Sequence, residues 1–379
     1  MPLTGIVQIN LQPHFGGGEV YTAFLCRALD QLGVASTLFA HPDAHFWTQL
    51  DLPASTVIER VADAGKIAAV LPKYPLWLLG HGPLPAILRD TALPHRLRTA
   101  IAHMPLQGRN PRAFDGHDRV FPVSAWVREG LLAAGVPAWP APLYGVAELR
   151  QRPGSGEIRR NSRYDWDRRK VRDRLLGRLE PLGTALRSQP RFIRSPALTL
   201  GIVSRLTPIK QFPLRFSLLV PVLQCHPELR IEIFGSGGYA SVRDLQRALA
   251  PIAGQVRYWG HQADVRAVYA QLDYLLTGLP EKEALGLNVI EAQSANLPVL
   301  AVRAPPFTET VAEGLTGFFY RDPREDAGAD FARLLEQIVS RTHPLRPAEA
   351  LTHLAQFSFA AFVERLRPVV AWAAAELHA

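Results

Sequence analysis

Cysteine is scarce in this 379-residue sequence, which contains only Cys26 and Cys225. The two residues are far apart, and each falls inside an apolar, helix-like pattern. Two isolated cysteines cannot build the disulfide framework of a small secreted protein or the clustered ligands of a zinc site. We therefore expect both cysteines to be buried core residues.

Long apolar runs are also missing. The longest uncharged run extends roughly from Phe216 to Cys225, whereas a membrane-spanning helix needs about 20 apolar residues. The first residues, MPLTGIVQINL, have neither the basic start nor the small-residue cleavage site of a signal peptide. These features predict a cytoplasmic protein that does not cross a bilayer.

Apolar residues are nevertheless abundant, at 47% of the chain, with 20% charged residues. This composition excludes a disordered or collagen-like chain and favours a globular protein. Because one hydrophobic core rarely extends beyond about 250–300 residues, the length predicts two domains.

The net charge of +8 comes from one segment. Residues 150–194 contain 14 Lys and Arg against 5 Asp and Glu, which leaves the rest of the chain near neutral. Such a segment is either a solvated linker or a surface for phosphates or an anionic membrane. A charge confined to one segment does not indicate a nucleic-acid partner for the whole protein.

The N-terminal half alternates short apolar strands with helix-like stretches. Its first unit is a strand at Gly5–Leu11, a loop of three glycines at 16–18, and a helix at Tyr21–Leu32 that ends at Gly33. Further strands are predicted at Ser36–Ala40, Leu76–Leu79, Thr99–His103 and Arg119–Pro122, with a helix at Trp126–Ala134. Alternating strands and helices predict a parallel sheet.

A second series of the same kind fills the C-terminal half. Its strands are nearly continuous apolar runs, as expected when helices cover both faces of a sheet. They are predicted at Leu198–Ser204, Arg230–Phe234, Gln255–Gly260, Asp273–Gly278 and Leu297–Val302, and an alanine-rich helix ends the chain.

The predicted fold is therefore α/β, with two doubly wound Rossmann-like domains facing an interdomain cleft. We expect the first domain at 1–165, a basic linker at 166–195 and the second domain at 196–354, with the last helix, about 355–379, able to pack back on the first. Ligands of such sheets bind beyond the carboxyl ends of the strands.

Two carboxylates, Glu283 and Glu291, are the strongest local signal for chemistry. Glu283 follows a strand and comes just before a helix, where the backbone N–H groups of 285–288 could meet an anion. Glu291 follows within that helix and could face the same ligand. Two solvated glutamates at a helix start would be the simpler interpretation of this pair alone.

The longer string around them, EALGLNVIEAQSANLPVLAV, resembles the E-x7-E element of the retaining glycosyltransferases of family 4. Upstream, GIVSRLTPIK is similar to the strand and loop in which that family's Arg and Lys bind a nucleotide diphosphate; here they are Arg205 and Lys210. Other elements follow in the family's order, namely GGGE, VFPVSAWVREGLLAAGVP, IEIFGSGGY, VRYWGHQADVRAVYAQLDYLL and PPFTETVAEGLTGFFYRDP.

This resemblance implies a GT-B fold that binds a nucleotide diphosphate sugar in the C-terminal domain and an acceptor in the N-terminal one. Glu283 would contact the donor sugar, Glu291 the ribose, and Arg205 with Lys210 the diphosphate as it leaves. His103 matches a histidine near the sugar, although a structural histidine is an alternative. The remaining donor-binding candidates are Gly17, Gly18, Gly235, His261, Gly286, Leu287 and Asn288. The resemblance implies no protein nucleophile, no obligatory cofactor and no metal.

The acceptor implied is a glycan or lipid-linked saccharide of cell-surface polysaccharide assembly. With the local charge, this leads to the hypothesis that the protein lies peripherally on the inner face of a membrane. The residues expected to meet an anionic membrane or lipid pyrophosphate are Arg159, Arg160, Arg168, Arg169 and Lys170.

Several departures and alternatives remain. Pro280 replaces a usual Ser, Ala284–Leu285 replaces Gly-Phe, and Asn296 replaces a Gly, which puts the donor in question. A dinucleotide enzyme would suit GSGGYA at 235–240, but no acidic residue follows at the required distance. The D-x-D string at 165–167 lacks a preceding apolar strand, and we interpret it as an ion-paired helix start. Rival functions are a catalytically silent binding protein, a sugar phosphorylase or an epimerase.

Overall fold

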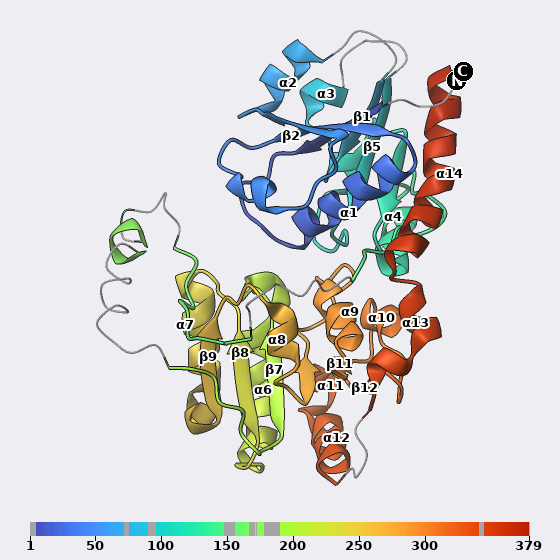
Figure 1. Ribbon diagram of the computed structural model, residues 1–379. Coiled ribbons are helices and arrows are strands. Elements are labelled where there is room, and N and C mark those ends of the chain that lie inside the picture. Colours follow the sequence, from blue (N-terminus) through green and yellow to red (C-terminus); the bar gives the residue numbers. More distant parts are fainter. Residues whose placement is uncertain are drawn as a thin grey trace. The chain divides into compact units, whose positions relative to one another are not determined.

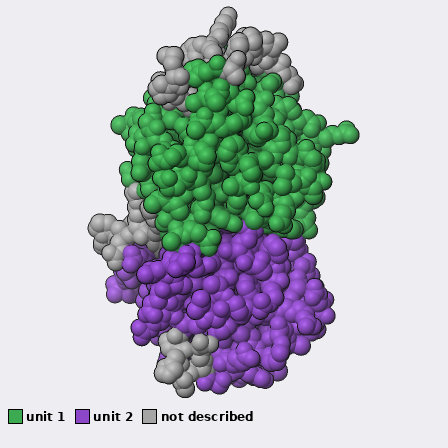
Figure 2. Space-filling model, turned by 90° about the vertical axis from the view of Figure 1, so that its right-hand side faces the viewer, with its two compact units in different colours: residues 1–147, 355–379 green, residues 148–354 purple. Residues whose placement is uncertain are grey.

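The computed structural model describes residues 5–71, 76–89, 96–147, 156–166, 171, 173–177, 190–340 and 345–378. The chain divides into two compact units, coloured separately in Figure 2. Unit 1 comprises residues 1–147 and 355–379, and unit 2 comprises residues 148–354. Each unit is a three-layer α/β body built around a parallel sheet (Figure 1).

The sheet of unit 1 has six strands in the order β3-β2-β1-β4-β5-β6, and all neighbouring pairs are parallel. Its central strands are almost fully buried, because helices cover both faces. The strands are β1 (Gly5–Asn10), β2 (Ala35–Ala40), β3 (Thr56–Arg60), β4 (Leu76–Gly80), β5 (Arg96–Ala102) and β6 (Arg119–Pro122).

The helices of unit 1 begin and end at residues that suit those positions. After the first helix, Gly33 has a φ of 76°, and the next N–H, of Val34, donates to the Leu29 carbonyl at 2.9 Å. Ser124 caps a later helix by accepting from the N–H of Val127 at 3.1 Å. The α-helices are α1 (Gly17–Gln31), α2 (Ala64–Val70), α3 (Ala86–Arg89), α4 (Ala125–Ala133) and α14 (Phe359–His378); short 3₁₀ turns are η1 (His45–Gln49) and η2 (Pro111–Phe114).

The sheet of unit 2 repeats this topology with the order β12-β11-β10-β7-β8-β9, again all parallel. Numbered from its own first strand, it has the order 3-2-1-4-5-6 of unit 1, which is the dinucleotide-fold order. The strands are β7 (Thr199–Val203), β8 (Arg230–Phe234), β9 (Val256–Gly260), β10 (Tyr274–Leu276), β11 (Val299–Val302) and β12 (Gly317–Tyr320).

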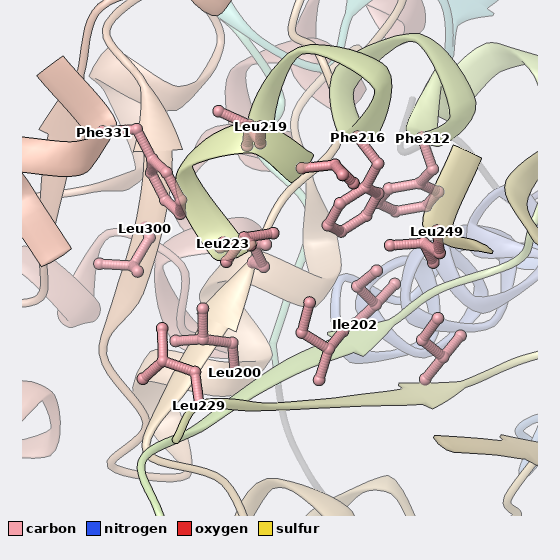
Figure 3. Close-up of a cluster of buried hydrophobic side chains, with 14 of the residues drawn as sticks. Leu200, Ile202, Phe212, Phe216, Leu219, Leu223, Leu229, Leu249, Leu300 and Phe331 are labelled. Carbon is pink, nitrogen blue, oxygen red and sulfur yellow. The ribbon is translucent and has the colours of Figure 1, made fainter. Parts of the chain in front are cut away.

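Helices pack on both faces of this second sheet. One face carries a large apolar cluster that joins Leu200, Ile202 and Leu300 of the sheet to Phe216 and Leu219 of α6 (Figure 3). A separate cluster on the other face includes residues of α8 and α9. The helices are α6 (Phe212–Gln224), α7 (Tyr239–Leu249), α8 (Val265–Tyr269), α9 (Leu287–Ser294), α10 (Phe307–Thr310), α11 (Pro323–Asp326), α12 (Ala329–Val339) and α13 (Leu351–Ala355), with 3₁₀ turns η3 (Pro208–Lys210), η4 (Ala250–Gln255) and η5 (Pro347–Glu349).

The predicted α/β class with two doubly wound sheets is confirmed. The prediction of a buried Cys225 is wrong, because this residue caps the C-terminus of α6 and lies outside the buried stripe of that helix. Cys26 is buried, as expected. Asp165 itself is not helical, and its backbone N–H donates to the Gly237 carbonyl at 2.9 Å. Asp167, the other acid of the predicted helix start, lies outside the described residues.

Both sheets have a topological switch point, where the chain leaves two neighbouring strands in opposite directions. In unit 1 it lies between β1 and β4, and in unit 2 between β7 and β10. The loops that follow these strands diverge and leave room for a ligand at the carboxyl edge of the sheet. The switch points therefore define where the side chains of a site are to be sought.

Candidate active site

The loop after β7 carries the two cations predicted to bind a diphosphate. Arg205 is exposed, and Lys210 lies at the end of η3, partly shielded. Gln211 follows with a left-handed φ of 53° and leads directly into α6. The loop therefore makes a sharp turn at the switch point, with Lys210 on the side of β10.

Two glycines in the loop after β8 allow this loop to pack closely on the loop after β7. A Cβ on Gly235 would lie 1.9 Å from the carbonyl oxygen of Ser204, and a Cβ on Gly237 would lie 2.1 Å from that of Leu206. The N–H of Leu206 in turn donates to the Ser236 carbonyl at 2.8 Å. The GSG string therefore shapes the cation-bearing loop, since any side chain there would push the two backbones apart.

The loop after β10 brings Glu283 to Lys210. The backbone makes this possible at Gly278, where a Cβ would lie 2.3 Å from the carbonyl oxygen of Lys210. The Nζ of Lys210 and Oε2 of Glu283 form an ion pair, with 20% and 15% of the two side chains exposed. Residues 73 positions apart, each predicted to contact the donor, thus form one charged pair.

A second set of ionic contacts holds this loop, and no local sequence pattern predicts these contacts. Glu281 accepts hydrogen bonds from Gln211 at 2.9 Å and from Arg324 at 2.8 and 3.1 Å. Arg324 also binds Asp322, which follows β12. Burial raises the pKa of Glu281, but the hydrogen bonds from Arg324 and Gln211 outweigh it and lower that pKa below its usual value. The loop that carries Glu283 is therefore also held in place by the bonds to Glu281, two residues earlier.

Helix α9 begins beside this pair. Gly286 adopts a φ of 81° at its N-cap, and the first N–H bonded within the helix is that of Val289, to the Gly286 carbonyl at 2.9 Å. The backbone N–H groups of Leu287 and Asn288 precede it in the first turn. The side chain of Asn288 donates to the Val203 carbonyl at 3.1 Å and so ties the helix start to the end of β7.

Glu291 lies one turn further along α9. The Tyr269 hydroxyl lies 3.2 Å from Glu291 Oε2 and 3.3 Å from the Asn288 carbonyl. Burial raises the pKa of Glu291 above its usual value, and the hydrogen bond from Tyr269 offsets this only in part. The carboxylate is thus held in a site that disfavours its charge, and a second hydrogen-bond donor from a ligand would stabilise the charged form.

We predict that Glu291→Gln stabilises the protein without ligand at neutral pH. A raised pKa in the folded state favours folding below the unfolded pKa, and this contribution is lost as the pH rises through the folded pKa. At pH 7 the partly buried carboxylate therefore destabilises unit 2, and the neutral amide should raise its unfolding temperature by a few degrees. The gain should shrink toward pH 4, where the native carboxyl is protonated.

Thermal unfolding at pH 7 and pH 4 checks this, with the exposed Glu336→Gln as the control. A gain of the same size at both pH values, or a loss at pH 7, would contradict the prediction. Nucleotide binding should weaken in the same variant, because an acid with a raised pKa that is retained at a cost in stability is typical of a functional site.

The unit 1 candidates lie at the carboxyl edge of its own sheet. Gly17 and Gly18 open α1, and a Cβ on Gly18 would meet no described atom within 4 Å. His103 follows β5, and its ring packs edge-on against Tyr21 at 4.9 Å between centroids. Burial lowers the pKa of His103 to about 4, so the imidazole is neutral at physiological pH.

The basic segment runs over the ends of β8 and β9 in unit 2. Gly260 has a φ of 69°, and a Cβ there would lie 2.3 Å from the Ser162 carbonyl oxygen. His261, the next residue, is exposed, and its carbonyl accepts from the Asn161 side chain at 2.7 Å. His261 thus lies at the same sheet edge as the other donor-binding candidates of unit 2.

The two described cations among the predicted membrane-contacting residues, Arg159 and Arg160, have protein contacts. Arg159 pairs with Glu157 at 2.7 Å, and the guanidinium of Arg160 lies 5.4 Å from the centre of the Trp259 ring. Arg168, Arg169 and Lys170 lie outside the described residues. Among the described helices, none is long and apolar enough to cross a membrane. Within the described part of the chain, no group of three or more His, Cys, Asp or Glu side chains could hold a metal ion.

The predicted site residues therefore fall into two sets. Those of unit 2 gather where β7, β8, β9 and β10 end, and they are Arg205, Lys210, Gly235, His261, Glu283, Gly286, Leu287, Asn288 and Glu291. Gly17, Gly18 and His103 belong to unit 1. The sequence analysis did not identify Tyr269, which bonds to Glu291, or Gln211 and Arg324, which bond to Glu281, because each is distant in sequence from its partner.

Comparison with known proteins agrees with this description. Residues 188–347, which lie in unit 2, match the family model described as "Glycosyl transferases group 1". The D-inositol 3-phosphate glycosyltransferase of Stackebrandtia nassauensis is 32% identical over 181 residues. That alignment covers 43% of this chain and 39% of the relative, so the chain matches well under half the length of that protein.

Similar folds extend over nearly the whole chain. Anabaena HepE, solved in complex with UDP and glucose, has a TM-score of 0.72 at 16% identity, covering 97% of this chain and 99% of that one. The lipopolysaccharide outer core galactosyltransferase WaaB has a TM-score of 0.63 at 13% identity, covering 96% and 98%. The two doubly wound sheets thus define a protein of the GT-B fold.

Proposed function

We propose that this protein is a retaining glycosyltransferase of family 4 that moves a sugar from a nucleotide diphosphate sugar to a hydroxyl group. In this reaction the bond between the sugar C1 and the diphosphate oxygen breaks, and a bond from C1 to the acceptor oxygen forms. The acceptor loses its proton, and the nucleotide diphosphate leaves as an anion. The single observation that carries the proposal is the Lys210–Glu283 pair at the switch point of a group 1 domain.

Unit 2 would bind the donor through this pair. Lys210 and Arg205 would neutralise the leaving diphosphate, which is stabilisation of charge where it develops. The N–H groups of Leu287 and Asn288 would add the positive end of α9. Because Glu283 already orients the Lys210 ammonium, little reorganisation is needed when the phosphates arrive. Glu283 would then bind sugar hydroxyls, and Glu291 the ribose.

Unit 1, together with the helix at 355–379, would bind the acceptor and supply Gly17, Gly18 and His103. The empty space around Gly18 supports the idea that its missing side chain serves a ligand, since the described chain does not require glycine there. His103, neutral at pH 7, would contact a sugar hydroxyl. Catalysis by these residues would require neither a protein nucleophile nor an obligatory metal.

The donor base proposed is uracil, because HepE, which shares the fold, was solved with UDP. Thermal unfolding with UDP, GDP, ADP and dTDP tests this. A ligand at about 100 times its Kd adds about 2.7 kcal/mol to the folded state, or roughly 5–10 °C in a domain of this size. We expect that shift with UDP, and its loss in Arg205→Ala.

The outcomes separate the rival functions. No shift with any nucleotide would favour a silent binding protein. A UDP shift with turnover of the donor in the absence of an acceptor hydroxyl would favour an epimerase, and turnover that depends on free phosphate would favour a phosphorylase. Incorporation of labelled sugar into an added saccharide acceptor would support the transferase.

The acceptor proposed is a glycan or lipid-linked saccharide of cell-surface assembly at an anionic membrane. Besides the local charge, exposed apolar side chains support a membrane contact, namely Val171, Leu175 and Ile193. Neutralising Arg159, Arg160, Arg168, Arg169 and Lys170 should abolish sedimentation with anionic vesicles, and salt should weaken that of the native protein. Neutralising Arg243 and Arg247 of α7 is the control, and equal losses in both variants would refute a specific role of the segment.

A further inference from the structure

A chain of polar side chains runs along the carboxyl edge of the unit 1 sheet and ends at His103. It begins on β1 with Gln8, which is fully buried, and continues to His81, the first residue after β4. His103 follows the next strand, β5. Three neighbouring strands thus bring together residues that are 73 and 22 positions apart.

The distances in this chain are those of hydrogen bonds. Gln8 Oε1 lies 2.9 Å from His81 Nε2, and His81 Nδ1 lies 3.2 Å from His103 Nε2. The rings of His81 and His103 are nearly parallel, at 12° with centroids 5.5 Å apart. Both side chains are therefore oriented by the sheet itself.

The order of donors follows from Gln8. Its amide nitrogen donates to Ser36 Oγ at 3.0 Å and to Cys26 Sγ at 3.3 Å, so its oxygen faces His81. An amide oxygen can only accept, so His81 must carry its proton on Nε2 and present Nδ1 as a lone pair. For His81 Nδ1 and His103 Nε2 to form a hydrogen bond at 3.2 Å, His103 must carry its proton on Nε2.

Neighbouring groups are consistent with this order. Thr22 Oγ1 lies 3.0 Å from His81 Nδ1 and accepts from Asn10 at 3.2 Å. Its hydroxyl can donate to the Nδ1 lone pair, and the Gly18 carbonyl at 2.8 Å is its alternative acceptor. Burial lowers the pKa of His81 well below its usual value, and the nearby His103 lowers it further. Two neutral imidazoles therefore share one hydrogen bond.

We propose that His81 is a positioning residue that holds His103 as the neutral Nε2–H tautomer, so that Nδ1 of His103 accepts a hydrogen bond from a substrate hydroxyl. This role rests on the proposed function. Nδ1 of His103 makes no hydrogen bond to the described residues, and its ring is fixed from the side by Tyr21. A lone pair attracts a hydroxyl and repels a phosphate oxygen, so His103 selects a saccharide hydroxyl over the diphosphate.

The test uses a matched pair of variants of the whole protein. Asparagine and leucine have nearly the same shape, but only asparagine can offer an acceptor to His103. In ¹⁵N-histidine NMR, with His103→Gln to assign the signals, His103 should be the Nε2–H tautomer in the native protein and in His81→Asn. In His81→Leu it should shift toward the Nδ1–H tautomer or a mixture.

Kinetics measure the consequence. With UDP-sugar donor and a saccharide acceptor, His81→Leu should lower kcat/KM for the acceptor about tenfold, as one lost hydrogen bond does, while the Kd for UDP stays within about twofold. His81→Asn should remain within about threefold of the native protein. His45→Leu, at an exposed histidine of unit 1, controls for the loss of an imidazole, and thermal unfolding confirms that each variant folds.

Each outcome decides a different point. An Nδ1–H tautomer or an imidazolium at His103 in the native protein, or an unchanged tautomer in His81→Leu, would overturn the positioning role. A changed tautomer with unchanged acceptor kinetics would overturn the hydroxyl contact. A native protein that transfers no sugar would refute the proposed function, while the NMR result would still decide the His81–His103 pair.

Discussion

Lys210→Ala should lower kcat/KM for the donor about 100- to 1,000-fold, the loss typical when one group that stabilises a developing anion is removed. The variant removes the cation proposed for the leaving diphosphate. It also leaves Glu283 without the ammonium that orients it, in a loop where only 15% of that side chain is exposed. Both effects should fall mainly on turnover, so kcat should decrease more than the Kd for UDP increases.

Lys282→Ala is the matched control, since it removes the same charge from an exposed position next to Glu283. Its activity should remain within about twofold of the native protein, because an exposed charge is well screened. Similar losses in both variants would indicate a general charge effect, and near-full turnover in Lys210→Ala would contradict the assigned role. Radiolabelled donor and an acceptor in excess provide the assay.

The largest loss of stability should follow Glu232→Met. This carboxylate on β8 is fully buried, and it accepts from Arg257 Nε at 2.8 Å and from the indole N–H of Trp259 at 2.6 Å. Its removal leaves both donors without their acceptor. Because 35% of the Arg257 side chain is exposed, we expect the free energy of unfolding to fall by about 2–3 kcal/mol. Breaking a fully buried ion pair would lower it by about 3–5 kcal/mol.

In a unit of this size that cost lowers the unfolding temperature by roughly 5–10 °C. The double variant Glu232→Met, Arg257→Met should recover part of the loss, because replacing both partners removes the unpaired charge. Glu228→Met, at an exposed position just before β8, is the control. A double variant less stable than Glu232→Met would contradict this explanation.

Most strands could be predicted from the sequence, and two could not. Runs without a charged residue, such as 199–203 and 299–302, are buried on both faces, and such runs predict the strands of a sheet covered by helices. β3 and β12 were missed because edge strands are half-exposed and short. β3 reads TVIER, in which exposed charges obscure the alternation.

The site could be predicted only as far as its separate motifs. Resemblance pointed to Lys210 and Glu283 individually, but their ion pair arises because β7 and β10 are neighbours in the sheet. Partners such as Arg324 and His81 have no sequence motif around them. An isolated arginine is usually a solvated surface residue and an isolated histidine usually a structural one, so neither indicates a site by itself. Only the strand order reveals which of them meet.

The return of the chain to unit 1 has a consequence for synthesis on the ribosome. Unit 2 is continuous in sequence, whereas α14, which packs on α1, β4 and β5, is synthesised only after unit 2. Phe362 meets Tyr21 at 5.5 Å between ring centroids, and Arg27 lies 4.6 Å from the ring centre of Phe359. Translation proceeds at about 5–20 residues per second. The nascent α1 therefore lacks its packing partner α14 until all of unit 2 has been translated. We therefore expect the nascent first unit, rather than the second, to be the client of chaperones.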